Sequence, residues 1–189
     1  MKYDLEFLEN YWMPFTSNRD FKADPRLVVR AEGVYMYSHE GERILDGSSG
    51  LFCCAAGHSR PEIAEAVSQQ ILRGTHLGAS TDEELRWARA IKALIPSIEK
   101  LRFHSSGTEA TLMAMRLSRA YTGKDKIIKL QDHVHGWHDY AMAGSDRAAP
   151  GIPLASWESM IIVPSGDLNA VEDALNGDSD IAALILEPT

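Results

Sequence analysis

Residues 181–186 decide the fold class, and they read Ile181-Ala182-Ala183-Leu184-Ile185-Leu186. The run is apolar throughout, whereas a strand with one face in water alternates apolar and polar side chains. It is therefore typical of a strand that is covered on both faces, as the strands of parallel sheets are. The run follows a helix expected over about 167–175. This helix and strand place the C-terminal part of the chain in the α/β class.

The same alternation of strands and helices extends from this run toward the N-terminus. Strands are expected near residues 100–104, at 126–130 and at 160–163, with a helix over about 107–121. The pattern predicts a mostly parallel sheet with helices on both faces, interrupted by a surface excursion at 143–157. One apolar stripe of the 107–121 helix is expected in the core, formed by Ala110, Met113, Ala114, Leu117 and Tyr121.

Two further helices are predicted between residues 59 and 96 from their start signals. Ser59-x-x-Glu62 and Thr81-x-x-Glu84 each match a capping box, in which two side chains bind each other's backbone amides at a helix start. Apolar residues recur at helical spacing after the first box, and Pro96 ends the second helix. We therefore expect two amphipathic helices ahead of the sheet.

The first fifty residues follow a different pattern. Residues 34–37 and 43–45 are β-like runs separated by a loop that contains Gly41, and they predict an antiparallel hairpin. The residues before them mix aromatic side chains with turn formers and predict an arm without regular elements. We expect an N-terminal arm and a small antiparallel element over residues 1–50, and the first part of a large domain over residues 51–189.

The composition of the 189 residues narrows the classes of partner. Lys and Arg number 19 against 27 Asp and Glu, and the formal net charge of -8 disfavours nucleic acid and anionic membrane surfaces. The only cysteines, Cys53 and Cys54, are adjacent, which disfavours a disulfide and indicates a reducing, cytoplasmic setting. The sequence contains neither an apolar run that could span a bilayer nor the apolar core of a signal peptide. We expect no nucleic-acid or membrane partner.

Three polar segments follow expected strands directly, at residues 105–110, 133–139 and 187–188. Ligands of open parallel sheets bind beyond the carboxyl ends of the strands, so these segments are candidate binding sites. The first segment also opens a helix, where free backbone amides and the positive end of the helix dipole attract anions. It is therefore a candidate phosphate site.

The residues of that first segment fit two interpretations. Gly107 permits close approach of an anion to the backbone, and Ser106 and Thr108 offer hydroxyl groups. The same residues also fit a plain capping box, Ser106-x-x-Glu109, which needs no ligand. The segment lacks the glycine spacing of nucleoside-triphosphate and dinucleotide loops, so both of those ligands are disfavoured.

The second segment holds three histidines, His133, His135 and His138, beside Asp139. Imidazole is a common zinc ligand, but this spacing matches no ligand pattern of a closed zinc site. We predict hydrogen-bonded loop histidines and no metal. Glu187, in the third segment, either anchors a loop or orients a ligand.

Together these motifs resemble those of the class III aminotransferases. The N-terminal region is similar to the ω-amino acid:pyruvate branch of that family, and the segment from Ser106 to Lys129 is especially similar to glutamate-1-semialdehyde aminomutases. The motifs that carry the resemblance are Trp12-Met13-Pro14-Phe15-Thr16, Leu45-Asp46-Gly47, Gly50-Leu51-Phe52-Cys53, Ala56-Gly57-His58, Ser106-Gly107-Thr108-Glu109-Ala110, His135-Gly136 and Leu186-Glu187-Pro188.

The resemblance implies a fold-type I enzyme that uses pyridoxal 5'-phosphate, as a homodimer with shared active sites. It implies that the cofactor phosphate is bound by Ser106, Gly107 and Thr108. It places Val134 and His135 over the pyridine ring, with Val134 where the family has an aromatic residue, and Glu187 beside the ring. It also implies that Phe15 and Phe52 shape the substrate pocket.

The family's Schiff-base lysine has no counterpart in a matching context here and is expected beyond Thr189. We therefore predict that the chain is the N-terminal portion of a longer protein. The implied reaction moves an amino group from an ω- or β-amino acid to a keto acid such as pyruvate. Two alternatives remain open: an aminomutase, which moves the amino group within one substrate, and a non-catalytic truncated fragment that binds an anion or a partner subunit.

Overall fold

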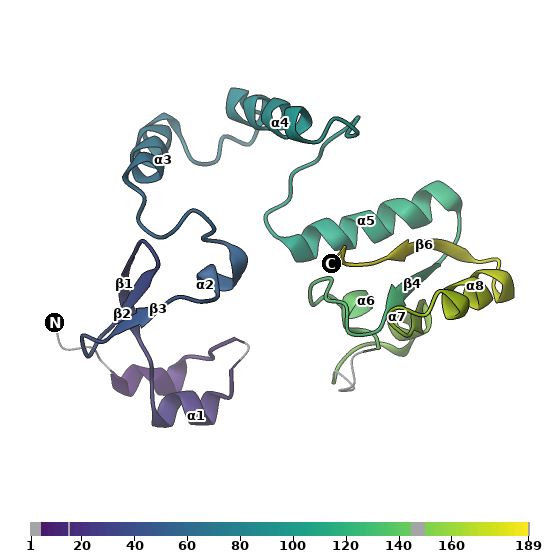
Figure 1. The fold of residues 1–189 in the computed structure, drawn as a ribbon, viewed down its shortest axis with the longest axis horizontal. Coiled ribbons are helices and arrows are strands. Elements are labelled where there is room, and N and C mark those ends of the chain that lie inside the picture. The colour runs from purple at the N-terminus through teal and green to yellow at the C-terminus, as the bar shows by residue number, and fades with distance from the viewer. Residues whose placement is uncertain (1–4, 15, 145–149, 189) are drawn as a thin grey trace. The chain divides into compact units, whose positions relative to one another are not determined.

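The structure is a computed structural model, and it describes residues 5–14, 16–144 and 150–188 (Figure 1). The chain divides into two compact units, with the boundary between Arg86 and Trp87. Each unit is described here by itself. The domain boundary predicted after residue 50 does not coincide with this division and stays a prediction about the whole protein. No helix in the described ranges is long and apolar enough to cross a membrane.

The N-terminal arm contains two short helices, which corrects the prediction of an arm without regular elements. They are η1 (Leu5–Asn10), a 3-10 helix, and α1 (Asn18–Ala23). Asn18 shapes the bend between them because its side-chain oxygen accepts from the Met13 amide at 2.8 Å and its amide group donates to the Met13 carbonyl at 3.1 Å. Such side-chain bonds to nearby backbone are local, but the sequence pattern does not reveal them.

A small antiparallel sheet follows the arm, in the strand order β1-β2-β3. It consists of β1 (Val28–Glu32), β2 (Tyr35–Ser38) and β3 (Arg43–Leu45). The predicted hairpin is β2 and β3, and β1 is an additional strand that pairs with β2. Two arginines stack on tyrosines of β2, which contributes to the cohesion of a sheet this small.

Element α2 (Ser49–Phe52) is a single left-handed turn rather than an ordinary helix. Its four residues all have positive φ, between 50° and 65°. Only Gly50 adopts this conformation without a steric penalty, and each of the three other residues costs about 1–2 kcal/mol. The turn therefore persists only if the surrounding structure holds it.

The two amphipathic helices are α3 (Pro61–Arg73) and α4 (Asp82–Leu94). The second capping box is confirmed, since the Thr81 amide donates to Glu84 at 2.9 Å and the Glu84 amide donates to the Thr81 hydroxyl at 3.3 Å. The first box is wrong: Arg60 is the N-cap of α3, and the hydroxyl of Ser59 donates instead to the Ala31 carbonyl at 2.6 Å. A tertiary partner thus replaces the local one.

The second unit contains the predicted parallel sheet, in the order β5-β4-β6. Its strands are β4 (Lys126–Leu130), β5 (Met160–Val163) and β6 (Ile181–Ile185). The described residues of this unit also form the helices α5 (Gly107–Thr122), α6 (Asp139–Met142), α7 (Leu154–Glu158) and α8 (Leu168–Gly177).

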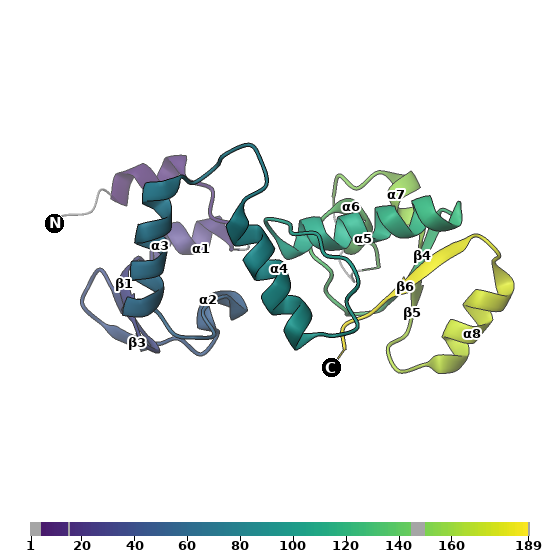
Figure 2. The ribbon, with the colours of Figure 1, turned by 90° about the horizontal axis from the view of Figure 1, so that it is seen from above.

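Helices cover both faces of this sheet, as predicted (Figure 2). On one face, Met115 of α5 packs with Ile127, Ala143 and Met160, joined by residues of α6 and α7. On the other face, α8 packs against a second cluster formed by Ile128, Val163 and Ile181. Successive residues of β4 therefore point into opposite cores, as the period of a strand requires.

Three expectations for this unit are wrong. Residues 100–104 form no strand. The excursion at 143–157 includes helix α7 and begins at Ala143, which is fully buried. The predicted core stripe of α5 lies largely outside: Leu117 is 66% exposed and Tyr121 is 90% exposed. The face that meets the sheet is instead the one that carries Met115, which is 2% exposed.

Candidate functional site

The N-terminus of α5 has the geometry of a capping box and also that of an anion site. Ser106 is the N-cap, and its hydroxyl oxygen accepts from the Glu109 amide at 3.2 Å while the hydroxyl donates to the Glu109 carboxylate at 3.2 Å. The capping box is thus formed. The amides of Gly107 and Thr108 precede the first hydrogen bonds of the helix and are available to an anion. A side chain built on Gly107 would meet no atom within 4 Å, so the approach to this backbone is open.

Gly136 joins the loop after β4 to the start of α5. It has a φ of +91°, and a Cβ atom at this position would lie 2.8 Å from the Thr108 Cα and 2.5 Å from its hydroxyl oxygen. Only glycine permits this approach. One turn further along α5, the Thr111 hydroxyl donates to the His135 carbonyl at 2.6 Å. The predicted phosphate segment and the histidine segment therefore pack directly against each other.

Glu187 joins the end of β6 to the same loop through two hydrogen bonds. Its carboxylate accepts from the Val134 amide at 2.9 Å, and its own amide donates to Nδ1 of His133 at 2.8 Å. The structure thus brings the three polar segments together at one edge of the sheet. Of the two roles left open for Glu187, these contacts correspond to the anchoring of a loop. The side chain of Val134 is 70% exposed beside it.

His135 is the buried polar group of this site. It is 5% exposed, and its Nε2 atom has no hydrogen-bond partner among the described residues. Burial lowers the pKa of His135, and the nearby Lys129 ammonium lowers it further. The imidazole is therefore neutral at physiological pH, with one ring nitrogen left for a ligand.

His138 holds the end of the same segment. Its Nδ1 atom accepts from the Ala141 amide at 3.3 Å, which caps α6, and its Nε2 atom lies 3.4 Å from the Thr111 hydroxyl oxygen. Burial lowers the pKa of His138 as well. The histidines of this segment therefore serve as separate hydrogen-bonding groups. Within the described ranges, no three His, Cys, Asp or Glu side chains gather as a metal site.

Lys129 is a site residue that the sequence interpretation missed. It lies on β4, is 4% exposed, and its ammonium donates to the carbonyls of Ala141 at 2.6 Å and Ala143 at 3.1 Å. Burial lowers the pKa of Lys129. These bonds tie the end of α6 to the central strand. The available signal was a lysine in the middle of a strand expected to be buried, because such a charge requires partners.

The two predicted substrate-pocket residues, Phe15 and Phe52, come earlier in the sequence than the residues at this edge of the sheet. Phe15 lies outside the described residues. Phe52 is the last residue of the left-handed turn in the first unit, and it is 88% exposed.

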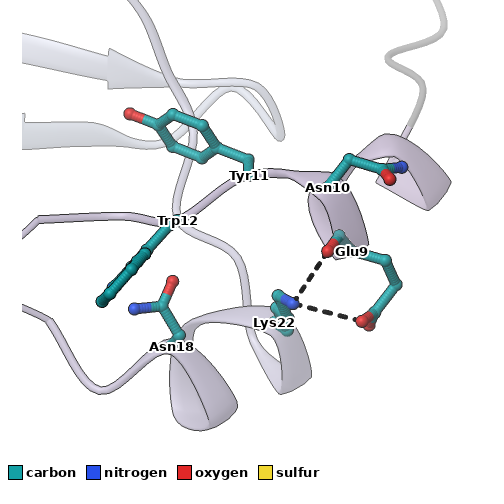
Figure 3. Close-up of a pocket in the computed structure, with 6 residues that line it drawn as sticks. All are labelled: Glu9, Asn10, Tyr11, Trp12, Asn18 and Lys22. Carbon is teal, nitrogen blue, oxygen red and sulfur yellow. Dashed lines mark hydrogen bonds and ion pairs between the residues drawn. The ribbon is translucent and has the colours of Figure 1, made fainter.

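The first unit has a pocket of its own beside η1 and α1, with a volume of about 260 Å³ (Figure 3). The Lys22 ammonium lies within it and donates to the carbonyl of Glu9 at 3.3 Å and to its carboxylate at 3.1 Å. Trp12 and Tyr11 contribute aromatic surface, and Trp12 is 86% exposed. Glu9 thus neutralises the charge of Lys22, and the described residues that line the pocket offer no other cation to an anion.

Comparisons with known proteins place this geometry in context. The family described as Aminotransferase class-III matches residues 16–189. Glutamate-1-semialdehyde 2,1-aminomutase from Methanopyrus kandleri is 38% identical over 179 residues, which are 90% of this chain and 42% of that protein.

Two solved structures are similar over nearly the whole chain. An omega-transaminase from Sphaerobacter thermophilus has a TM-score of 0.88 at 27% identity, over 97% of this chain and 46% of its own. A β-phenylalanine aminotransferase from Variovorax paradoxus has a TM-score of 0.81 at 30% identity, over 97% of this chain and 42% of its own. The chain therefore spans less than half the length of these proteins.

Proposed function

The chain belongs to the class III aminotransferases, and on that basis we propose that the full-length protein transfers an amino group from an ω- or β-amino acid to a keto acid such as pyruvate. Pyridoxal phosphate is the cofactor of this family. When bound, it supplies the electron sink that amino transfer requires. The observation that carries the proposal is the packing of Gly136 and His135 against the open start of α5.

The residues of this edge fit the cofactor. We propose that Ser106, Gly107 and Thr108 bind its phosphate through first-turn amides and hydroxyl groups, supported by the helix dipole. The open space at Gly107 supports this assignment. The hydroxyl of Ser106, which now donates to Glu109, would turn to a phosphate oxygen.

We assign the other side of the cofactor site to Val134, His135 and Glu187. The exposed Val134 side chain offers an apolar surface to a ring. The Nε2 atom of His135, which has no partner in the part of the chain that the structure describes, offers one hydrogen bond. Glu187 acts by holding the Val134 amide and thereby the loop. The lysine that binds the cofactor covalently is proposed to lie outside this chain, in a homodimer whose two subunits complete each site.

A second candidate is an aminomutase reaction, favoured by the 38% identity to glutamate-1-semialdehyde 2,1-aminomutase. The two reactions differ in their need for an acceptor. An aminotransferase requires a keto acid for turnover, whereas an aminomutase isomerises one substrate without it.

The test uses the full-length protein loaded with pyridoxal phosphate. Incubation with β-phenylalanine or β-alanine is expected to yield alanine only when pyruvate is present. Isomerisation of glutamate-1-semialdehyde without any keto acid, together with no alanine from a panel of ω- and β-amino acids, would establish the second candidate instead. If neither reaction occurs, the catalytic proposals are wrong and the non-catalytic alternative stands.

A further inference from the structure

The buried carboxylate of Asp46 lies directly before the left-handed turn Ser49–Phe52. Its side chain is 2% exposed, and its pKa is lowered first by the hydrogen bond from His58 and then by bonds from Ser48 and Gly50, against the opposing effect of burial. A carboxylate with this many donors is held as the anion. The arrangement is therefore a fixed acceptor for the segment that follows it.

Four hydrogen bonds converge on this carboxylate. His58 Nε2 lies 2.6 Å from Oδ2, and the Gly50 amide donates to the same oxygen at 2.9 Å. The amide and hydroxyl of Ser48 donate to Oδ1 at 3.2 Å and 3.0 Å. Two of these donors are backbone amides at the entry to the turn and inside it, so Asp46 sets the path of the strained backbone.

Both members of the Asp46–His58 pair are anchored in turn on the connection between β1 and β2. The Asp46 amide donates to the Val34 carbonyl at 2.9 Å, while His58 exchanges two backbone hydrogen bonds with Gly33, at 2.7 Å and 3.0 Å. Gly57 is in tight contact with the same point, since a Cβ there would lie 3.1 Å from the Gly33 carbonyl oxygen. Hydrogen bonds to the β1–β2 connection thus fix the two residues that hold the strained turn.

The turn presents large apolar side chains outward. Leu51 is 73% exposed and Phe52 is 88% exposed, although both occupy a conformation that L-residues avoid. Backbone strain that is held in place by a dedicated set of hydrogen bonds is common where a protein must present particular side chains.

We infer that Asp46 and His58 are positioning residues, which hold the left-handed turn so that Phe52 forms a fixed apolar wall for the side chain of the amino donor. The inference rests on the proposed amino transfer and on the role in the substrate pocket that the resemblance to class III aminotransferases implies for Phe52. It predicts that the pair acts on donor size: a donor with an aryl group depends on the wall, and β-alanine, which has no such group, does not.

The experiment uses the full-length, cofactor-loaded protein with Asp46→Asn and His58→Gln, and with Asp24→Asn as a matched control outside the turn. Hydrogen exchange of the amides of residues 50–54 is measured, together with kcat/KM for β-phenylalanine and β-alanine with pyruvate. Phe52→Ala is made alone and combined with Asp46→Asn. If Asp46→Asn does not fold, Ser48→Ala removes a single hydroxyl bond and supplies the same test.

We expect exchange at residues 50–54 to rise about tenfold in both pair variants and to stay unchanged in the control. The kcat/KM for β-phenylalanine should fall about tenfold, and that for β-alanine by less than about twofold. In the Phe52→Ala background, Asp46→Asn should cause no further loss of donor discrimination, because both changes act through one wall.

Two results would overturn the inference. One is hydrogen exchange at residues 50–54 of Asp46→Asn that is as slow as in the unchanged protein, and the other is an equal loss of kcat/KM for β-phenylalanine and β-alanine. Absence of amino transfer in the unchanged protein is a different outcome, and it refutes the proposed function on which the inference rests.

Discussion

The turn at Ser49–Phe52 and the loop at His133–His138 are both irregular segments held by buried polar groups, but the groups are of opposite kinds. Asp46 holds the turn as a charged acceptor whose pKa is lowered by its hydrogen bonds. The loop is held beside Lys129, His135 and His138, whose pKa values are lowered by burial. The turn thus stabilises the negative charge of Asp46. The loop, in contrast, destabilises positive charge on its lysine and histidines. The comparison shows that two segments held by buried polar groups can lose stability to acid in different pH ranges.

The largest expected effect comes from replacing the glycine that joins the loop to α5. Gly136→Ala places a Cβ 2.8 Å from the Thr108 Cα in a backbone with φ of +91°. We expect the free energy of unfolding to fall by about 3–4 kcal/mol and cofactor affinity to fall at least about 100-fold. Denaturant titration and cofactor titration of the full-length protein measure these two quantities.

The matched control for that change is Gly166→Ala. Gly166 has a φ of +79°, but a side chain there would meet no atom within 4 Å. It should lose only about 1 kcal/mol and leave cofactor affinity unchanged. Equal effects of the two substitutions would show that backbone conformation, and not the contact with Thr108, accounts for the loss.

Removing the buried ammonium of the loop region should have the next largest effect. Lys129→Met leaves the carbonyls of Ala141 and Ala143 without this donor, and we expect the free energy of unfolding to fall by about 1–3 kcal/mol. Hydrogen exchange should rise at residues 133–143. The control Lys124→Met should leave both quantities unchanged. A gain in stability for Lys129→Met would mean that the desolvation of the charge outweighs its hydrogen bonds.

Mild acid should separate the two regions. The folded-state pKa values of His135 and His138 lie below 6.5, so below pH 6.5 the unfolded chain binds protons that the folded loop does not. Stability should therefore fall as pH falls from 6.5, by at most about 1.4 kcal/mol per pH unit for each histidine.

The turn should respond to acid in a different pH range. The pKa of Asp46 lies below 3.8, so its stabilising contribution is complete above 3.8 and is lost only as pH falls through the lowered value. Between pH 7 and 5, hydrogen exchange corrected for its intrinsic rate should rise at residues 133–138 and stay constant at 50–54. A parallel rise in both segments would contradict the assigned charge states, and His135→Asn should reduce the rise at 133–138.

The smallest expected effect concerns one hydroxyl group. Thr111→Val removes the bond to the His135 carbonyl, and we expect a loss of about 1 kcal/mol in the free energy of unfolding with faster exchange at residues 135–138. Thr122→Val, on the same helix, removes the bond to the Ser118 carbonyl and the bond from the Lys124 amide, both far from the loop, and should leave exchange at those residues unchanged. Identical exchange at residues 135–138 in the two variants would show that the Thr111 hydroxyl does not stabilise the loop.

Local patterns predicted most of the regular elements of the second unit. The strands at 126–130 and 160–163 match the observed β4 and β5 residue for residue, because short apolar runs between turn signals constrain a strand from both ends. The polar segments at the strand ends were also found from the sequence. Lys129 was missed because its carbonyl partners lie 12 and 14 residues away and have no sequence signature.

The failures share a physical reason. Ser59 left its predicted capping role because its hydroxyl bonds to Ala31, 28 residues earlier. The predicted core stripe of α5 was wrong because an amphipathic helix can rotate to bury a different face, and the sheet selected the face of Met115. In both cases an interaction with residues distant in sequence replaces the one that the local pattern predicts.

The sequence by itself determined the type and order of the main elements, the polar segments at the carboxyl edge of the sheet and the resemblance to the class III aminotransferases. These features depend on residues within one helix turn or one strand of each other. The left-handed turn at Ser49–Phe52 and the contact between Gly136 and Thr108 were decided by the tertiary structure. Local preference opposes a left-handed turn. The nearby Asp46 carboxylate binds its backbone, and that carboxylate is fixed in turn by His58, which is anchored on Gly33.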